Sequence, residues 1–343
     1  MTSVPYYCWR LAAAGVKRRG QSCLSSAAAG SVSSGKSSPT VPTSSPGLLW
    51  PYTTELVEGI LAGSRTSLSR AITLAVESHR LDHRRQAELL LDRVLSARET
   101  STAACPQPQG TNSGGGSADP ASSPPDTALR ERGISPAPSF PKLGMRVGIA
   151  GPPGAGKSSF IEVLGKDLTA AGNRVAVISI DPSSIRTGGS ILGDKTRMHE
   201  LSRDPRAFVR GCPARGVLGG ISRYTHEVVL LCQVAGYDPV IVETVGLGQS
   251  EVEVEYTVDM LLLLLPPAGG DDLQGSKKGI VEVADAIVVN KADGDLAKAA
   301  RATASDYAAA LGFARRKLSC WAPPVLRCSA LRREGIGAVW EQV

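Results

Sequence analysis

The stretch from Gly151 to Ser158 constrains the fold of this chain more than any other, because its sequence GPPGAGKS matches the phosphate-binding pattern GxxxxGK followed by Ser or Thr. The apolar residues 147–150 before it predict a buried strand, and residues 160–164 after it continue in helical register. Backbone N–H groups of such a turn wrap phosphate oxygens, and the N-terminus of the following helix adds its dipole. We therefore predict that Lys157 reaches the β- and γ-phosphates of a nucleotide and that the Ser158 hydroxyl ligates Mg²⁺. The predicted phosphate-binding residues are Gly151, Pro152, Pro153, Gly154, Ala155, Gly156, Lys157, Ser158 and Ser159.

The net charge of +6 belongs to the N-terminus and does not indicate a nucleic-acid partner. Five cations, Arg10, Lys17, Arg18, Arg19 and Lys36, precede the first acidic residue, Glu55, and leave +6 − 5 = +1 for the remainder. Residues 1–46 are also rich in Ser and Ala, which is typical of an organellar transit peptide and predicts a mitochondrial location. A disordered tail without a targeting role remains the alternative.

Other composition signals are mostly negative. No run approaches the ~20 apolar residues of a membrane span, so no membrane partner is expected. The seven cysteines form no CxxC pair and are odd in number, which fits a reducing compartment and indicates neither a structural metal nor a disulfide framework.

Three segments follow the N-terminal one. Residues 47–98 show helical periodicity and predict a small helical arm packed on the main domain, and a free-standing coiled coil is disfavoured because the heptads are not sustained. Residues 99–142 are dominated by Pro, Gly, Ser, Ala and Thr, and we predict a flexible low-complexity linker. Residues 143–343 form the predicted P-loop domain.

Within this last domain, strand and helix patterns alternate, which predicts an α/β fold with a mainly parallel sheet. The further predicted strands are residues 175–180, 207–210, 240–242, 260–265, 286–289 and 325–328, with a helix over 219–235. Ligands bind at the carboxyl ends of the strands in such sheets. This rule gathers Asp181, Glu243, Asn290 and Ser329 at the same edge as the P-loop.

The segment Asn290 to Asp293 has the sequence NKAD and matches the guanine-recognition pattern NKxD. The Asp293 carboxylate can accept hydrogen bonds from guanine N1–H and the exocyclic amine, a donor pair that adenine does not present. A P-loop ATPase is therefore disfavoured. The predicted base-binding residues are Asn290, Lys291, Asp293, Ser329, Ala330 and Leu331.

Three further segments resemble switch regions of the MeaB/ArgK-type GTPases. Residues 181–184 (DPSS) with 188–198 (GGSILGDKTRM) resemble the first switch, residues 243–251 (ETVGLGQSE) the second, and residues 263–275 (LLLPPAGGDDLQG) a further switch loop of that family. The resemblance covers the helical arm loosely and residues 145–343 almost continuously. It implies a P-loop GTPase that uses GTP to gate the loading of adenosylcobalamin onto methylmalonyl-CoA mutase in the mitochondrial matrix, and that protects this mutase.

The resemblance also implies site residues. Mg²⁺ is expected near Ser158, Asp181, Asp194 and Glu243, with at least one of the three carboxylates acting through water. The catalytic residues that we predict are Lys157, Glu243, Asp194, Gln249 and Lys277. Gln249 and Glu243 are both candidates for orienting the attacking water. We also expect a mutase partner to press on residues 268–278 and to bring Asp271 or Lys277 toward the phosphates.

The chain departs from the family in two places, and two alternatives remain. The linker 99–142 is longer than the usual connection in the family. The family dimerises through a C-terminal helical arm, and since the sequence ends at Val343 we expect a monomer or a weak dimer. The alternatives are a nickel-insertion GTPase, which four scattered histidines disfavour, and a scaffold that binds nucleotide without turnover.

Overall fold

The computed structural model describes residues 49–77, 81–103, 143–181, 198–213, 224–244, 254–267, 278–313 and 317–343. The predicted transit peptide and most of the predicted linker lie outside these residues. So do four predicted site residues, namely Asp194, Gln249, Asp271 and Lys277.

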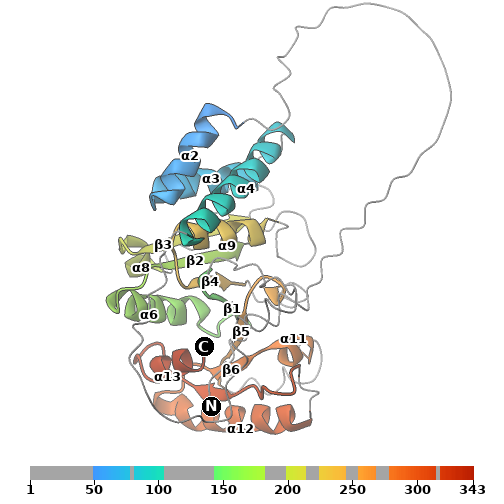
Figure 1. Ribbon diagram of the computed structural model, residues 1–343. Coiled ribbons are helices and arrows are strands. Elements are labelled where there is room, and N and C mark those ends of the chain that lie inside the picture. Colours follow the sequence, from blue (N-terminus) through green and yellow to red (C-terminus); the bar gives the residue numbers. More distant parts are fainter. Residues whose placement is uncertain are drawn as a thin grey trace, which may run out of the picture. The chain divides into compact units, whose positions relative to one another are not determined.

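A parallel sheet forms the centre of residues 143–343, as predicted. In the described residues it has seven strands in the order β3-β2-β4-β1-β5-β6-β7, and every neighbouring pair is parallel. Figure 1 shows this order from β3 to β6. The strands are β1 (Arg146–Ala150), β2 (Val175–Asp181), β3 (Ala207–Pro213), β4 (Val240–Glu243), β5 (Met260–Leu265), β6 (Ala286–Val289) and β7 (Val325–Arg327).

One strand differs clearly from its prediction. β3 was predicted to end at Arg210, whereas it continues to Pro213 and pairs with β2 up to Asp181. The residues Gly211 to Pro213 have the composition of a turn, and their strand conformation comes from hydrogen bonding with β2. β7 ends at Arg327, one position before the predicted end at Cys328.

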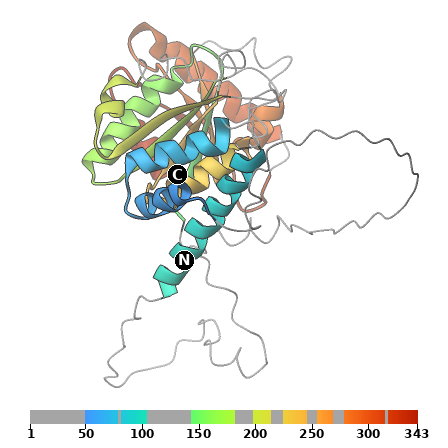
Figure 2. The same cartoon turned by 90° about the horizontal axis from the view of Figure 1, so that it is seen from above.

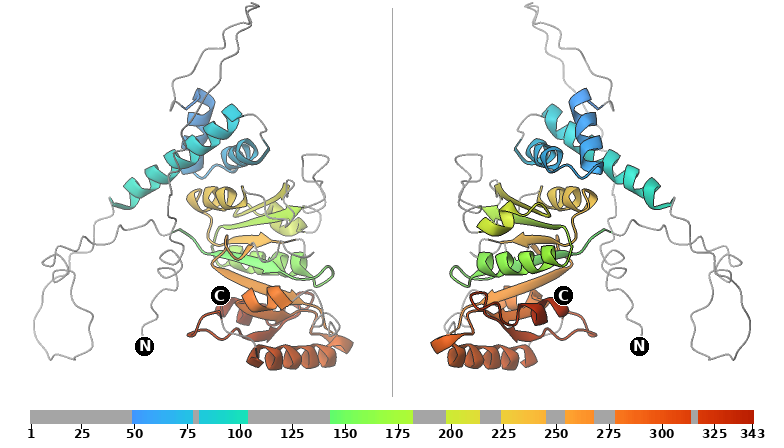
Figure 3. Two further views of the ribbon diagram at one scale, coloured as in Figure 1. Left: turned by 90° about the vertical axis from the view of Figure 1, so that its right-hand side faces the viewer. Right: turned by 90° about the vertical axis from the view of Figure 1, so that its left-hand side faces the viewer.

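The helices lie on both faces of the sheet. They are α2 (Pro51–Leu61), α3 (Arg65–Glu77), α4 (Leu81–Ala103), α6 (Lys157–Ala170), α8 (His199–Arg203), α9 (Thr225–Val234), α11 (Lys278–Val283), η3 (Gly294–Leu296), α12 (Ala297–Phe313) and α13 (Ile336–Glu341). Figure 3 shows helices placed along the strand order, from α9 (yellow) past α6 (green) to α12 (red). Among the described residues, no helix is long and apolar enough to cross a membrane.

Side chains alternate between two apolar clusters because successive strand residues point to opposite faces. Along β2, Val175 and Val177 belong to the cluster that contains α6, α8 and α13. The intervening Ala176 and Ile178 belong to the cluster that contains α2, α3, α4 and α9. The central strands β1, β4, β5 and β6 are therefore buried on both faces, which explains their nearly continuous apolar sequences.

The predicted helical arm consists of α2, α3 and α4, which contact α9. Figure 2 shows these helices (blue and cyan) beside α9 (yellow). α4 runs to Ala103, past the predicted arm boundary at residue 98. The segment after residue 98 contains no Pro or Gly before Pro106, so nothing in it stops the helix earlier. The predicted helix over 219–235 is α9, and residues 219–223 lie outside the described part.

Candidate nucleotide-binding site

The P-loop leaves the sheet at its centre. β1 lies between β4 and β5, and Gly151 follows its last residue. Gly151 has φ +147° and passes so close to β5 that a Cβ would lie 2.0 Å from the Leu264 carbonyl oxygen. Gly154 and Gly156 have φ +82° and +87°, in the left-handed region that favours glycine. These constraints explain why the turn needs glycine, and they direct the chain into α6.

The charge of Lys157 is held within this loop. Lys157 is buried, and its Nζ donates hydrogen bonds to the carbonyl oxygens of Gly151 (2.6 Å) and Pro152 (3.2 Å). It is also the first residue of α6, where the helix dipole favours an anion. Pro153 and Gly154 are exposed in the turn, and Ser159 is exposed in the first turn of α6. The loop therefore combines a cation with a helix N-terminus, an arrangement suited to phosphate.

An oxygen-rich cluster lies beside the start of α6. Glu243, at the end of β4, accepts hydrogen bonds from Ser158 Oγ to Oε1 (2.7 Å) and from Ser179 Oγ to Oε2 (2.8 Å). Hydroxyl and carboxylate oxygens are the ligands that Mg²⁺ prefers, so Ser158 and Glu243 fit this ion. Asp181 is the last residue of β2, at the same edge of the sheet, and its side chain lies outside the described part. The structure thus brings together two of the four residues predicted for Mg²⁺.

Asn290 joins the P-loop to the predicted base-binding segment. Its side chain is 1% exposed. Its Nδ2 donates to the carbonyl oxygens of Ala155 (2.9 Å) and Gly156 (3.4 Å), and its Oδ1 accepts from the Ala330 N–H (3.1 Å). A Cβ at Gly156 would lie 2.6 Å from Asn290 Nδ2. One amide side chain therefore sets the distance between three segments that are far apart in the sequence.

The remaining predicted base-binding residues lie around Asn290. Ser329 Oγ donates to Asp293 Oδ2 and accepts from the Arg332 N–H (3.1 Å). Lys291 has φ +57°, which is uncommon for a residue with a side chain and marks a sharply turned backbone after β6. Leu331 is 86% exposed, so any contribution to base binding would come from its backbone.

Two contributors were missed from the sequence. Ser179 binds Glu243, and Cys328 Sγ lies 3.5 Å from Asn290 Oδ1. Burial raises the pKa of the Cys328 thiol to about 12, so it stays protonated and can donate to Asn290. A polar residue inside the apolar run VAVISI is a signal that could have found Ser179. Cys328 had no such signal, because a cysteine next to a strand is commonly a core residue.

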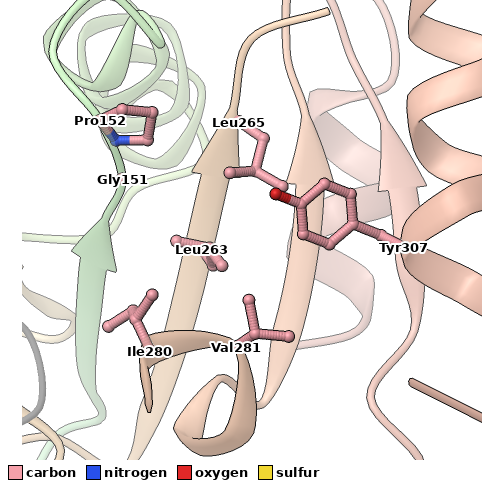
Figure 4. A pocket seen from close by; sticks show the side chains of 7 residues that line it. All are labelled: Gly151, Pro152, Leu263, Leu265, Ile280, Val281 and Tyr307. Carbon is pink, nitrogen blue, oxygen red and sulfur yellow. The ribbon is translucent and has the colours of Figure 1, made fainter. Parts of the chain in front are cut away.

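A small cavity lies next to the first turn of the P-loop, and it does not hold the nucleotide. Its volume is about 10 Å³, roughly the room that one water needs. Figure 4 shows Leu263 and Leu265 of β5, Ile280 and Val281 of α11, and Tyr307 of α12 around it, with Gly151 and Pro152 at its edge. Most of its lining is apolar and Lys157 is not part of it, so the cavity is not suited to a phosphate.

Comparisons with known proteins agree on one family. The sequence model of the family described as "Methylmalonyl Co-A mutase-associated GTPase MeaB" matches residues 140–343. The mouse protein named methylmalonic aciduria type A homolog, mitochondrial, is 45% identical over 290 residues, which are 84% of this chain and 62% of that protein. GTPase ArgK of Escherichia coli is 54% identical over 199 residues, which are 58% of this chain and 60% of that protein.

A solved structure described as the LAO/AO transport system kinase has the same fold. It has a TM-score of 0.61 and 34% sequence identity, and the match covers 86% of this chain and 74% of that chain. The chain thus spans about three fifths of the two relatives named above and three quarters of this structure.

Proposed function

Because the chain belongs to the MeaB family of methylmalonyl-CoA mutase-associated GTPases, we propose that it binds GTP and hydrolyses it with Mg²⁺ at the site described above. The observation that carries this proposal is the position of Asn290, whose Nδ2 donates to the Ala155 carbonyl oxygen (2.9 Å). This bond places the NKxD segment directly beside the phosphate-binding loop. A guanine base and a triphosphate could then be held by neighbouring segments.

Each group would have a distinct role. Lys157 and the P-loop amides would hold the β- and γ-phosphates, and Asp293 would accept the two guanine donors. Ser158 and Glu243 would hold Mg²⁺, together with Asp181 and Asp194 as further predicted ligands. When bound, this ion neutralises charge that develops on the phosphoryl oxygens. Hydrolysis then depends mainly on positioning, and Gln249 or Glu243 would orient the attacking water.

The partner that we propose is methylmalonyl-CoA mutase. The family description names this enzyme, and the switch-like segments identified in the sequence would let GTP control how the protein engages it. In this proposal, GTP hydrolysis gates the transfer of adenosylcobalamin to the mutase. Contact with the mutase would bring Lys277 toward the γ-phosphate, where a cation stabilises the transition state as an arginine finger does.

Turnover with and without the mutase tests this function. We expect purified protein to release phosphate from GTP slowly, and added mutase to accelerate the release. Lys277→Ala should reduce the mutase-stimulated rate, and Lys157→Ala, which removes the phosphate-binding cation, serves as the inactive control. A rate that does not change over a full titration of mutase would contradict the role in mutase maturation. Absence of any GTP turnover would favour a nonhydrolysing scaffold.

We also propose that the protein works in mitochondria. The support is the cation-rich, acid-free sequence of residues 1–46, together with the word mitochondrial in the name of the mouse relative. A fusion of residues 1–50 to a fluorescent reporter should enter mitochondria. A reporter that stays in the cytosol would contradict this location.

A further inference from the structure

Ser179 is a buried hydroxyl in the C-terminal half of β2 that binds the carboxylate of Glu243. Its side chain is 3% exposed, and Glu243 is 7% exposed. In the parallel β2–β4 pair, Ser179 and Glu243 are directly registered partners. Ser179 Oγ donates to Glu243 Oε2 (2.8 Å), whereas Ser158 Oγ donates to the other oxygen, Oε1 (2.7 Å).

The direction of these side chains follows from strand alternation. Val175 and Val177 of β2 and Ile241 of β4 belong to the apolar cluster that contains α6. Ser179 and Glu243 continue the same alternation and therefore point to the face that α6 covers. Ser158, in the first turn of α6, meets Glu243 there. Ser179 thus points to the same face of the sheet as Val175 and Val177, but it carries a hydroxyl in place of an apolar side chain.

A hydroxyl at this position restricts how the carboxylate can turn. If the Glu243 carboxylate were held at a single oxygen, it could rotate about its terminal bond. Two hydroxyl donors, one at each oxygen, fix the plane of the group. With its proton directed to Glu243 Oε1, the Ser158 oxygen keeps its lone pairs for another partner, such as a cation.

We propose that Ser179 is a positioning residue for Mg²⁺ binding, because it holds Glu243 in the orientation in which Glu243 engages Ser158. Ser179 does not touch the ion or the nucleotide in this proposal, and it acts through Glu243. Partners that orient metal-site residues in this way commonly change metal affinity by ten- to a hundredfold when they are removed. The inference rests on the proposed function, since it concerns the Mg²⁺ of the same site.

The test is the Mg²⁺ dependence of nucleotide release. A fluorescent GDP analogue is bound, and its dissociation rate is measured over a Mg²⁺ titration and in excess EDTA. In Ser179→Ala, we expect the Mg²⁺ concentration that half-maximally slows release to rise about tenfold. The release rate in EDTA should be unchanged, because the P-loop and Asn290 are intact. Ser179→Thr keeps the hydroxyl and should restore most of the wild-type response.

Thr169→Val is the matched control. Thr169 is also a buried hydroxyl that donates to a carboxylate oxygen at 2.8 Å, in this case Oδ2 of Asp204. Both variants lose a hydrogen bond from a buried hydroxyl to a carboxylate oxygen, and Thr169→Val also removes the contact of Thr169 Oγ1 with the Lys166 carbonyl oxygen (3.1 Å), so both should lower the unfolding temperature. Only Ser179→Ala should change the Mg²⁺ response. An equal change in both variants would mean that the effect is one of general stability, and it would overturn the proposal.

A double variant tests whether Ser179 acts through Glu243. In a Glu243→Ala background, adding Ser179→Ala should cause no further change in the Mg²⁺ response. A full tenfold change in that background, or an unchanged response in Ser179→Ala alone, would overturn the inference. Either result leaves the proposed function standing if the wild-type protein hydrolyses GTP with Mg²⁺. A wild-type protein that does not hydrolyse GTP with Mg²⁺ would instead contradict the proposed function itself.

Discussion

At the scale of single residues, Asn290 connects the phosphate and base segments of the site. It is a satisfied buried amide, with both Nδ2 and Oδ1 bonded to backbone groups. Leaving a buried donor or acceptor without a hydrogen-bond partner costs about 1–3 kcal/mol of stability. The residues that contact Asn290 are therefore constrained as well. Gly156 is constrained most directly, because any Cβ there would meet Asn290 Nδ2 at 2.6 Å.

Cys328 gives a prediction at the same scale. Burial raises the pKa of its thiol to about 12, so the thiol stays protonated at pH 8 and is shielded from reagents. Cys320 is exposed. Alkylation of the folded protein at pH 8, mapped by mass spectrometry of peptides, should therefore modify Cys320 and spare Cys328 until denaturant is added. Modification of Cys328 at the rate of Cys320 in the folded protein would contradict this burial.

The sign of the accompanying pH dependence follows from the same shift. The folded protein holds the Cys328 proton more tightly than the unfolded chain does. The stabilisation is therefore complete below the unfolded pKa near 9 and is lost as the pH rises toward 12.

The sequence motifs predicted which residues form the site. They did not predict which neighbouring side chains hold those residues in position. GxxxxGK and NKxD identify Lys157 and Asn290 because each pattern needs particular residue types at a fixed spacing. Ser179 lies outside both patterns. Its contact with Glu243 depends on the β2–β4 register, which pairs residues 64 positions apart in the sequence. Register of this kind comes from the whole sheet and cannot be deduced from a local pattern.

At the scale of elements, α8 is a short helix held by a residue of α6. Glu162 Oε1 accepts hydrogen bonds from the N–H groups of Glu200 (2.7 Å) and Leu201 (3.1 Å) in the first turn of α8. The N-cap residue Met198 makes no side-chain capping bond. A helix of five residues is too short to be stable alone, so its capping must come from tertiary contacts.

We therefore expect Glu162→Ala to lower the free energy of unfolding by about 1–2 kcal/mol. Glu162→Gln keeps an acceptor without the charge and should cost less. The exposed Glu200→Ala on the same helix is the control and should change stability by no more than about 0.5 kcal/mol. Urea unfolding measures the free energies, and amide hydrogen exchange at Glu200 and Leu201 reports the cap directly. Wild-type exchange at both amides in Glu162→Ala would show that the cap is unimportant.

At the scale of the whole molecule, the helical arm is bonded to the edge of the sheet. Arg210 of β3 donates to the Ser69 carbonyl oxygen (2.8 Å), to Ser69 Oγ (2.7 Å) and to Thr73 Oγ1 (2.8 Å), all on α3. Arg174 donates to the Gly63 carbonyl oxygen (3.3 Å) between α2 and α3. The apolar residues of α2, α3 and α4 also share one buried cluster with α9 and the sheet. Within the described residues, the arm is therefore part of the same packed body as the sheet.

Hydrophobic periodicity predicted that the arm is helical and that the sheet is parallel. The sequence also predicted that the arm packs on the main domain, but not which surface receives it, because the pattern of α3 shows that one face is apolar without showing which surface covers it. The sequence also did not predict that α4 continues to Ala103, past the predicted arm boundary at residue 98. Residues 99–103 contain neither Gly nor Pro, and the composition of the linker as a whole obscured this.

In the proposed function, the P-loop and the Asn290–Asp293 segment together form one guanine-nucleotide site. Asp293→Asn tests it most directly, because the substitution replaces a carboxylate acceptor by an amide donor and leaves the P-loop unchanged. Competition binding of GTP and XTP should show that the wild-type protein prefers GTP by a wide margin. In Asp293→Asn, GTP should weaken at least tenfold, about 1.4 kcal/mol, and XTP should gain. The same GTP to XTP preference in both proteins would remove Asp293 from the base site and contradict a single guanine-nucleotide site formed by these two segments.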